Sequence, residues 1–527
     1  MTRRIVRTIV HISATALFTF IFIFFLDRNF RVLPNAIHGY LPTHHAGSVI
    51  TDITIAKCSS INVFSSCTLD QTCGRLNPQL AGDKKKKHGA GEKEEEPWEA
   101  RPGGLWIKRS NRRGVSDSEH AVTAVDVLFG DDAVEARPGW EVTGMPLLLD
   151  GGTKIPSAQL TVRRGAPKEI PKPVPKIGDN GRFKIVQLAD LHLSTGVGNC
   201  RDAVPEDWNG GKCEADPRTL DFVNKVLEEE RPNLVVLSGD QVNGDTAPDV
   251  QTAIFKYAQL LIKRKIPYVS IFGNHDDEGT MSRAAQMELI EALPYSLSKA
   301  GPPEIDGVGN YYIEVLARGS SGHSAITVYL LDSHAYSPNE RKYPGYDWIK
   351  KNQIDWFRAT AQGLKKQHRD YTHHHMDVAF IHIPIPEYVD VNATRVGNWG
   401  EPSTIPQYNS GFYEAMTAEG VAMVSCGHDH VNEYCALPQQ PEGEKSKIGP
   451  WMCYAGGTGF GGYAGYGGFV RRIRVFDFDM NEARITTWKR VEHGEDVGKR
   501  VDELILVDGG RPVRPPPPEE EEQQSEA

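Results

Sequence analysis

The feature that most constrains this chain is a short apolar run that ends in an acidic residue. Residues 234–237 read Leu-Val-Val-Leu and are followed by Ser238, Gly239 and Asp240. A wholly apolar run of this length favours a strand that is buried on both faces of a sheet. Asp240 then lies at the carboxyl end of that strand, where the crevices of α/β folds bind ligands. One such strand end carries little information, but several others in the chain also stop at Asp, Asn or His.

Several predicted strand ends are followed by side chains with carboxylate, amide or imidazole groups. In chain order they carry Asp190 and His192, then Asp240, then Asn274, His275 and Asp276, then His382, and finally His428 and His430. Oxygen and imidazole ligands without a thiolate suit Mn, Fe or Zn and disfavour Cu(I). A set of this size exceeds what one metal needs but suits two metals that share a carboxylate. Asp240 is the predicted shared ligand.

Predicted strands and helices alternate over residues 181–495. The apolar runs predict strands at 183–188, 234–237, 268–272, 311–316, 326–331, 378–381 and 421–425. Helices are expected from Asp216, at 250–263 and at 353–366, and a final hairpin is expected at 469–478 and 483–491. Alternation of this kind is typical of a layered α/β fold with mixed sheets.

The order of these motifs resembles a known family. Asp-x-His, Gly-Asp, Gly-Asn-His-Asp, a later His and Gly-His-x-His follow one another as in the calcineurin-like metallophosphoesterases. The chain is most similar to the purple-acid-phosphatase-like branch of fungi and plants, and the similarity covers about residues 180–490. The resemblance implies a four-layer αββα sandwich of two mixed sheets flanked by helices. It does not extend to the β-rich region before residue 180.

The resemblance also implies roles for individual residues. Asp190, His192, Asp240 and His430 would hold one metal, and Asp240, Asn274, His382 and His428 would hold the other. A metal-bridging hydroxide would attack phosphorus. His275 would protonate the leaving group or stabilise charge on the phosphoryl group, with Asp276 orienting it. Coloured members of the family carry Tyr where this chain has Asn243, so we expect a colourless enzyme whose metal pair is drawn from Mn, Fe and Zn.

Three functions are compatible with such a site. The first is a phosphatase that hydrolyses phosphomonoesters, plausibly on phosphoproteins. The second keeps the site but takes phosphodiesters or nucleotides, because surrounding loops rather than metal ligands select the substrate. The third is a scaffold or binding protein with an idle metal site. No nucleic-acid partner is expected, because the net charge of -10 opposes binding by phosphate neutralisation.

The amino-terminal region predicts a membrane anchor. Residues 9–26 are mainly apolar, and basic residues among 1–8 favour a cytosolic amino terminus. A cleaved signal peptide is the alternative. With an anchor, the catalytic part lies in the lumen of the secretory pathway or vacuole. The sequon at Asn392 and the paired spacing of some cysteines agree with a glycosylated, oxidising compartment.

The remaining segments are predicted from composition and repeats. Glu-Ala-Arg-Pro-Gly occurs at 99–103 and 135–139, which suggests that 48–165 is an all-β domain of two imperfect repeats. A charge-segregated insertion lies within it at 83–96. Residues 166–180 read as a Pro-rich linker, and 511–527 form a Pro/Glu tail that we expect to be disordered.

Several further residues carry open alternatives. Asp332 and His334 end a strand and could face the cleft, and His373–His375 reads as a solvated loop. The segment 456–468, with Tyr463 and Tyr466, is either a substrate-facing loop or a close-packed turn. Asp429 is expected to support loop geometry. Cys200 with Cys213 and Cys435 with Cys453 bracket loops, Cys58, Cys67 and Cys73 cluster, and Cys426 is expected to be a buried free thiol.

Overall fold

The computed structural model describes most of the chain beyond residue 156. The described residues are 13–19, 21–23, 49–55, 98–101, 104–110, 119–147, 149, 156–320, 322–367, 374–439, 448–464 and 469–515. They belong to two compact units. The first comprises Met1–Val125, Leu147–Asp150 and Arg163–Ala166, and the second comprises Asp126–Pro146, Gly151–Val162 and Pro167–Ala527.

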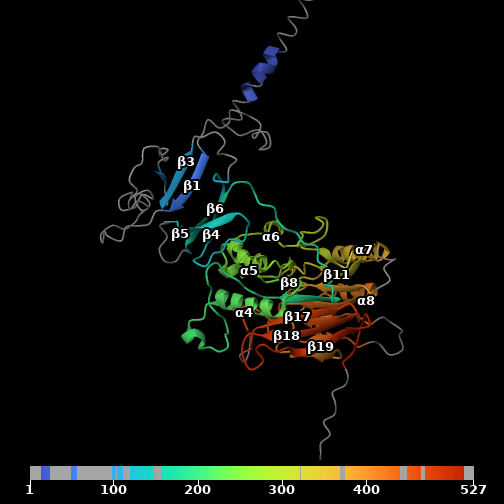
Figure 1. Ribbon diagram of the computed structural model, residues 1–527. Helices are drawn as coiled ribbons and strands as arrows, with labels where there is room; N and C mark the ends of the chain where they lie inside the picture. Colours follow the sequence, from blue (N-terminus) through green and yellow to red (C-terminus); the bar gives the residue numbers. More distant parts are fainter. Residues whose placement is uncertain are drawn as a thin grey trace, which may run out of the picture. The chain divides into compact units, whose positions relative to one another are not determined.

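The first unit contains a small antiparallel sheet. Its strands are β1 (Val49–Ile55), β3 (Leu105–Ser110) and β2 (Trp98–Ala100), in the order β1-β3-β2 (Figure 1). The guanidinium of Arg164 forms an ion pair with Asp52 of β1 at 2.7 Å. Of the predicted membrane segment 9–26, only 13–19 and 21–23 are described, and these are helical. Within the described ranges, none of the helices combines the length and the apolar character needed to cross a membrane.

A second small sheet has the order β4-β6-β5. Its strands are β4 (Val122–Phe129), β6 (Ala158–Arg164) and β5 (Trp140–Pro146). The division between the two units runs through β4 and β6, so the β-rich segment 48–165 is shared between them. Within the second unit this sheet is tied to a helix, since the Phe129 amide donates to Thr252 at 3.0 Å.

Two seven-stranded mixed sheets form the centre of the second unit. One has the order β20-β19-β18-β17-β7-β8-β9, with bounds Arg511–Pro512, Val501–Asp508, Arg484–Val491, Arg472–Asp479, Arg182–Leu188, Leu234–Ser238 and Tyr268–Ile271. The other has the order β10-β11-β12-β14-β16-β15-β13, with bounds Tyr311–Leu316, Ser324–Leu330, Met376–Phe380, Val421–Cys426, Trp451–Tyr454, Cys435–Leu437 and Thr394–Val396. The predicted α/β fold with mixed sheets is confirmed. The predicted disordered tail 511–527 is wrong at its start, because Arg511–Pro512 pair with β19, and 516–527 lie outside the described residues.

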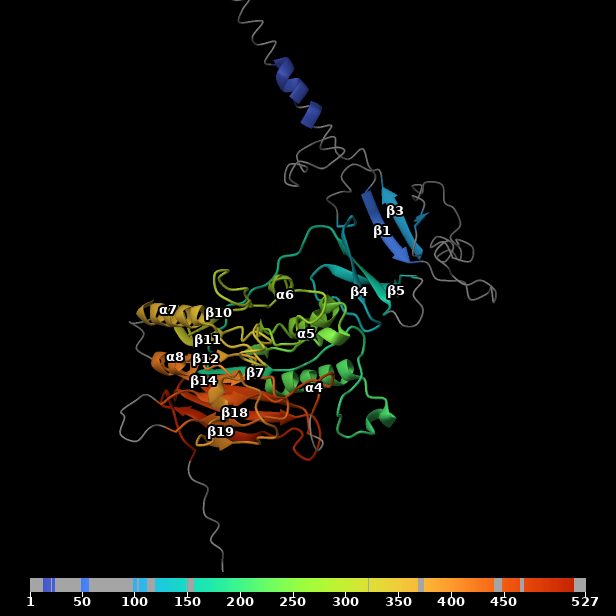
Figure 2. The same cartoon turned by 180° about the vertical axis from the view of Figure 1, so that it is seen from behind.

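Helices cover the two outer faces of the sheet pair. They are α4 (Ala215–Glu230), α5 (Val250–Arg264), α6 (Arg283–Glu291), α7 (Lys351–Gln367) and α8 (Phe412–Glu419), with short 3-10 turns at Trp208–Gly211, Gly244–Thr246 and Pro386–Val389. Figures 1 and 2 both show α4 and α5 on one side of the sheets and α7 and α8 on the other. The second unit is therefore layered as helices, sheet, sheet and helices.

Strand β8 shows why its sequence is apolar throughout. Leu234 and Val236 pack in the core between the two sheets, whereas Val235 and Leu237 pack in the cluster that includes α4 and α5. Side chains of a strand alternate between the two faces, so a strand covered on both sides has no position for a polar residue. All four are buried, and the chain turns polar only where the strand ends.

Disulfides form where the cysteine spacing predicted them. Cys200 bonds to Cys213, and Cys435 on β15 bonds to Cys453 on the neighbouring β16. Cys426 is free and buried, as expected. Cys58, Cys67 and Cys73 lie outside the described residues.

Candidate metal centre

The polar strand ends meet at one rim of the sheet pair. Strands β7, β8 and β9 run parallel in one sheet, and β12 and β14 run parallel in the other. Parallel strands present their carboxyl ends at a common edge. The residues that follow them are Asp190 and His192 after β7, Asp240 after β8, Asn274, His275 and Asp276 after β9, His382 after β12, and His428 and His430 after β14.

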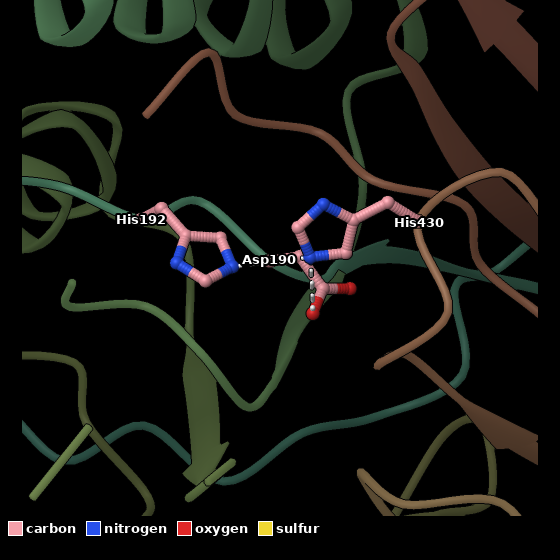
Figure 3. A group of neighbouring side chains, drawn as sticks. All are labelled: Asp190, His192 and His430. Atoms are coloured by element: carbon pink, nitrogen blue, oxygen red, sulfur yellow. Dashed lines mark hydrogen bonds and ion pairs between the residues drawn. The ribbon is translucent and has the colours of Figure 1, made fainter. Parts of the chain in front are cut away.

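The first group of candidate ligands consists of Asp190, His192 and His430. Each is buried, and each offers one ligand atom within 4.8 Å of the others (Figure 3). His430 Nε2 lies 3.4 Å from Asp190 Oδ1 and 3.1 Å from His192 Nε2. A carboxylate and two imidazole nitrogens therefore converge on one point.

The second group consists of Asp240, His382 and His428, which are buried and lie within the same 4.8 Å limit. His382 Nε2 approaches Asp240 Oδ2 to 3.2 Å. The same oxygen of Asp240 is 3.8 Å from Nε2 of His192, which belongs to the first group. The Asp240 carboxylate is part of the second group and also approaches the first, which agrees with its predicted role as a shared ligand.

Two buried polar atoms of this site support the fit of cations. Asn274 Oδ1 and His428 Nε2 have no hydrogen-bond partner among the described residues, although both atoms are shielded from solvent. Buried polar atoms are rarely left unpaired in folded proteins. Amide oxygen, carboxylate and imidazole are the donors that Mn, Fe and Zn accept. The donor set and the unpaired atoms therefore fit a pair of metal ions.

Contacts behind the imidazoles fix which nitrogen faces the centre. His382 Nδ1 lies 2.9 Å from the Ser238 carbonyl, and His430 Nδ1 lies 2.5 Å from the Tyr463 carbonyl. An N–H that donates to a carbonyl leaves the opposite nitrogen free to bind a metal. The Tyr463 ring also stacks on His430 with centroids 4.0 Å apart. Both histidines are therefore oriented with Nε2 toward the carboxylates.

The glycine-rich segment that contains Tyr463 packs closely against the first group. A Cβ at Gly462 would lie 2.5 Å from both His192 Cδ2 and His430 Cε1. At Gly459 a Cβ would collide with the Leu191 carbonyl. The described part of 456–468 is thus a close-packed turn, one of the two alternatives for this segment. Tyr466 lies outside the described residues.

The backbone at several ligands has an unusual conformation. Asp190, Asp240 and His428 have φ values of 57°, 52° and 78°. The left-handed region is uncommon for residues other than glycine, and such residues cluster at functional sites. Gly239 and Gly273, which flank these turns, leave room for ligand side chains from neighbouring strands. A side chain at Gly239 would collide with the His382 ring.

Asp276 has a different position from the one predicted. We expected it to orient His275, but its carboxylate turns back to the strand ends. There it accepts hydrogen bonds of 2.6–3.0 Å from four backbone amides, those of Gly273, Asp240, Gln241 and Val242. Burial and the charge of Asp240 raise the pKa of Asp276 to about 6. Asp276 therefore fixes the turn that carries Asp240.

Glu278 is the residue that contacts His275. Its Oε2 lies 2.6 Å from His275 Nδ1. Burial by itself lowers the pKa of His275, but the carboxylates of Asp240 and Glu278 outweigh it and raise that pKa above its usual range. Sequence reasoning missed Glu278, although it follows His275 by three residues in an acidic run, a spacing that brings side chains together in a tight turn.

The shared carboxylate is held in its charged form. Burial raises the pKa of Asp240, but the nearby imidazoles of His382, His192 and His275 lower it well below the usual range. Asp240 Oδ1 also accepts a hydrogen bond of 2.8 Å from the His275 amide. A carboxylate in this state is a suitable bridge between two cations.

Asp332 and His334 are engaged by other side chains. Asp332 Oδ1 accepts a 2.6 Å hydrogen bond from Arg283, which also donates to the Gly273 carbonyl at 2.6 Å. His334 Nε2 lies 2.8 Å from Gln353 Oε1. These contacts connect the β11 strand end to the β9 turn. They give Asp332 and His334 a supporting position beside the site.

Asp429 supports loop geometry, as predicted. Its carboxylate accepts a 2.7 Å hydrogen bond from the Tyr454 hydroxyl and further hydrogen bonds from Thr404. Of the histidine run, residue 373 lies outside the described residues, His374 is exposed and His375 is half-buried beside Asp377.

The fold and the two ligand groups are those of a two-metal protein. Comparison with known sequences shows which family it belongs to. The model of the calcineurin-like phosphoesterase family matches residues 183–432. Phosphatase DCR2 of Saccharomyces cerevisiae is 38% identical over 406 residues, which cover 74% of this chain and 68% of that relative. The chain therefore belongs to the calcineurin-like phosphoesterase family.

Plant proteins are also among its relatives. "Probable inactive purple acid phosphatase 29" of Arabidopsis thaliana is 36% identical over 338 residues, covering 59% of this chain and 83% of the plant protein. A solved structure, the purple acid phosphatase PPD1 from yellow lupin seeds, aligns with a TM-score of 0.41 at 14% identity. The alignment covers 73% of this chain and 66% of the lupin chain.

Proposed function

We propose that this protein is a two-metal phosphatase that hydrolyses phosphomonoesters, with phosphoproteins as its substrate class. The observation that supports it is the pair of buried ligand groups, which approach each other at Asp240 and His192, with the His275 ring 5.4 Å from that of His192. A relative named a phosphatase, 38% identical to this chain, agrees with the proposal.

The metal-binding roles follow from the geometry and the family. Asp190, His192, Asp240 and His430 would hold one cation, and Asp240, Asn274, His382 and His428 would hold the other. When bound, the cations supply Lewis acidity, which activates water and neutralises charge on the phosphoryl group. Asn243 offers no phenolate, so we expect a colourless centre with Mn, Fe or Zn.

In this proposal the side chain of His275 protonates the leaving group. Glu278 accepts its Nδ1–H, which leaves Nε2 free to deliver a proton to the departing oxygen. The raised pKa of His275 keeps more of the imidazole protonated near neutral pH. Asp276 holds the backbone of Asp240 and thereby fixes the distance between the proton donor and the metal ligands.

The alternative of an idle metal site is less well supported. The word "inactive" in the names of plant relatives describes those proteins. In this chain each predicted ligand is present, and all of them except Asn274 belong to two compact buried groups, which supports a working site. His275 and its partner Glu278 are also present.

An assay on two substrate types tests the proposal. Protein loaded with Mn, Fe or Zn is given an aryl phosphomonoester and the matching bis-aryl phosphodiester, and kcat/KM is measured for each. We expect hydrolysis of the monoester to dominate. A strong preference for the diester would support the phosphodiesterase alternative. No hydrolysis of either ester by metal-loaded protein would support a binding role.

We also propose that the catalytic unit faces the lumen of the secretory pathway or vacuole, with residues 9–26 as a signal anchor. The two disulfides and the exposed sequon at Asn392 agree with this location. Expression in a eukaryotic cell followed by endoglycosidase treatment provides the test. A mobility shift that Asn392→Gln abolishes is expected, and an unshifted band would contradict lumenal exposure.

A further inference from the structure

A hairpin between β11 and α7 carries two tyrosines beside the metal centre. Tyr336 and Tyr346 form an antiparallel bridge, and the Ser337 amide donates to the Gly345 carbonyl at 2.8 Å. The two tyrosine rings stack with centroids 5.5 Å apart and planes inclined by 22°. Because the hairpin backbone is paired, the two rings are held in a fixed stack.

The two tyrosines contact two different parts of the candidate site, a metal ligand and the carboxylate that binds His275. Tyr346 meets the ring of the candidate ligand His428 edge to face, with centroids 4.3 Å apart. The Tyr336 hydroxyl donates to Glu278 Oε1 at 3.4 Å, and the other oxygen of that carboxylate contacts His275. The Glu278 carboxylate therefore connects Tyr336 to His275, the proposed proton donor.

Tyr336 remains half exposed in spite of these contacts. Its relative exposure is 50%, which places it among the more exposed large hydrophobic side chains described in the second unit. Tyr346 covers one face of the ring and the hydroxyl end is anchored at Glu278, so the exposed area lies on the opposite face. An anchored ring with a free face beside a catalytic group is suited to stack with a flat ligand.

We propose that the free face of Tyr336 is a leaving-group subsite that receives the ring of aryl phosphomonoesters, the class to which phosphotyrosine belongs. This inference rests on the proposed phosphatase function. Once the phosphoryl group is at the metal centre, the ester oxygen must lie near His275, and the group attached to that oxygen extends toward Tyr336. A phenyl ring gains a stacking contact there, whereas the methylene of phosphoserine does not.

The first test compares two peptides that differ only in the phosphorylated residue, tyrosine or serine. The ratio of their kcat/KM values is measured for the wild type, Tyr336→Ala, Tyr336→Phe and Tyr408→Ala. The intrinsic reactivity of each ester is the same in every variant, so changes in the ratio report the subsite. Tyr408 serves as the control, since it is 42% exposed but its ring contacts Tyr343 and Trp348.

We expect Tyr336→Ala to lower the tyrosine-to-serine ratio by about two- to tenfold, the size of an aromatic stacking contact. Tyr336→Phe keeps the ring and should keep the ratio, and Tyr408→Ala should leave it unchanged. An unchanged ratio in Tyr336→Ala, or an equal fall in Tyr408→Ala, would overturn the proposal.

A binding measurement separates this proposal from the proposed activity. Phenylphosphonate and methylphosphonate cannot be hydrolysed as esters, and their affinities for Mn-loaded protein can be measured by calorimetry without turnover. We expect phenylphosphonate to bind about two- to tenfold more tightly, and Tyr336→Ala to remove the difference. Equal affinities in the wild type would refute the subsite even if the phosphatase activity is present. A preserved difference with no turnover would refute the activity alone.

Discussion

The two ligand groups of the metal centre are supported in different ways. In the second group, His382 is oriented by the Ser238 carbonyl at the end of β8, and Asp240 is held by Asp276 from the adjacent turn. In the first group, His430 is oriented by Tyr463, which belongs to a segment far along the chain from β7. The orienting contacts of the second group thus come from strand ends and the turns that follow them, whereas His430 in the first group is oriented by a segment that supplies no candidate ligand.

This difference indicates which substitutions should disturb both ligand groups and which should disturb only one. Asp240 belongs to the second group but also approaches His192 of the first group at 3.8 Å. A change at Asp240 should therefore affect both groups. A change in the glycine-rich segment, which packs on His192 and His430, should affect the first group alone.

The largest effect is expected from Asp240→Asn. The substitution keeps the shape but removes the charge that the two cations would share, so we expect kcat/KM to fall by about ten-thousandfold and the metal content of both sites to fall. Metal analysis and a phosphatase assay check this. Wild-type activity in this variant would show that catalysis occurs elsewhere in the protein.

The next effect is expected from His275→Ala. Loss of the proton donor should lower kcat by about a hundred- to ten-thousandfold while the metal content stays at the wild-type level, because His275 belongs to neither ligand group. Metal analysis on the same sample distinguishes this from Asp240→Asn. A parallel loss of metal would assign His275 a role in holding the cations.

Gly462→Ala separates the two groups. Its Cβ would lie 2.5 Å from both His192 and His430, so the first site should bind its cation about tenfold more weakly while the second is spared. Gly363→Ala is the matched control, because a Cβ added at that glycine would meet no atom within 4 Å. Competition with a chelator measures the two affinities. Equal weakening at both sites would show that the groups are not separable.

The smallest effect is expected from Glu278→Gln. The protonated form of His275 is required, so activity falls as pH rises through the pKa of His275. The Glu278 carboxylate contributes to raising that pKa, and its neutralisation should move the alkaline limb of the pH profile to lower pH. Profiles of kcat/KM against pH for the wild type and the variant provide the measurement. A limb that does not move would exclude Glu278 as the partner of His275.

The strand ends could be predicted from sequence because local patterns specify them. Leu234–Leu237 must be covered on both faces, and the glycine that follows brings Asp240 to the edge of the sheet. The same reading of the other apolar runs locates the Asp, Asn and His residues that follow them. The mixed-sheet fold and the set of candidate ligands were accessible for this reason, whereas the division of the ligands into two groups came from the resemblance to a known family.

Other features required the folded chain. Asp276 is next to His275 in the sequence and Glu278 follows His275 by three residues, yet only the three-dimensional turn shows that Asp276 faces the strand-end amides while Glu278 faces the imidazole. The close packing of Gly462 on the first group joins segments that are far apart in sequence. The division of 48–165 between two units likewise depends on contacts of 126–146 with the catalytic unit.

The most direct test of the central claim is metal analysis of the purified protein alongside a phosphomonoesterase assay. We predict two transition-metal ions per chain and hydrolysis that disappears on chelation and returns when Mn, Fe or Zn is added. Protein that binds no metal and stays inert with each of these ions supplied would contradict the account.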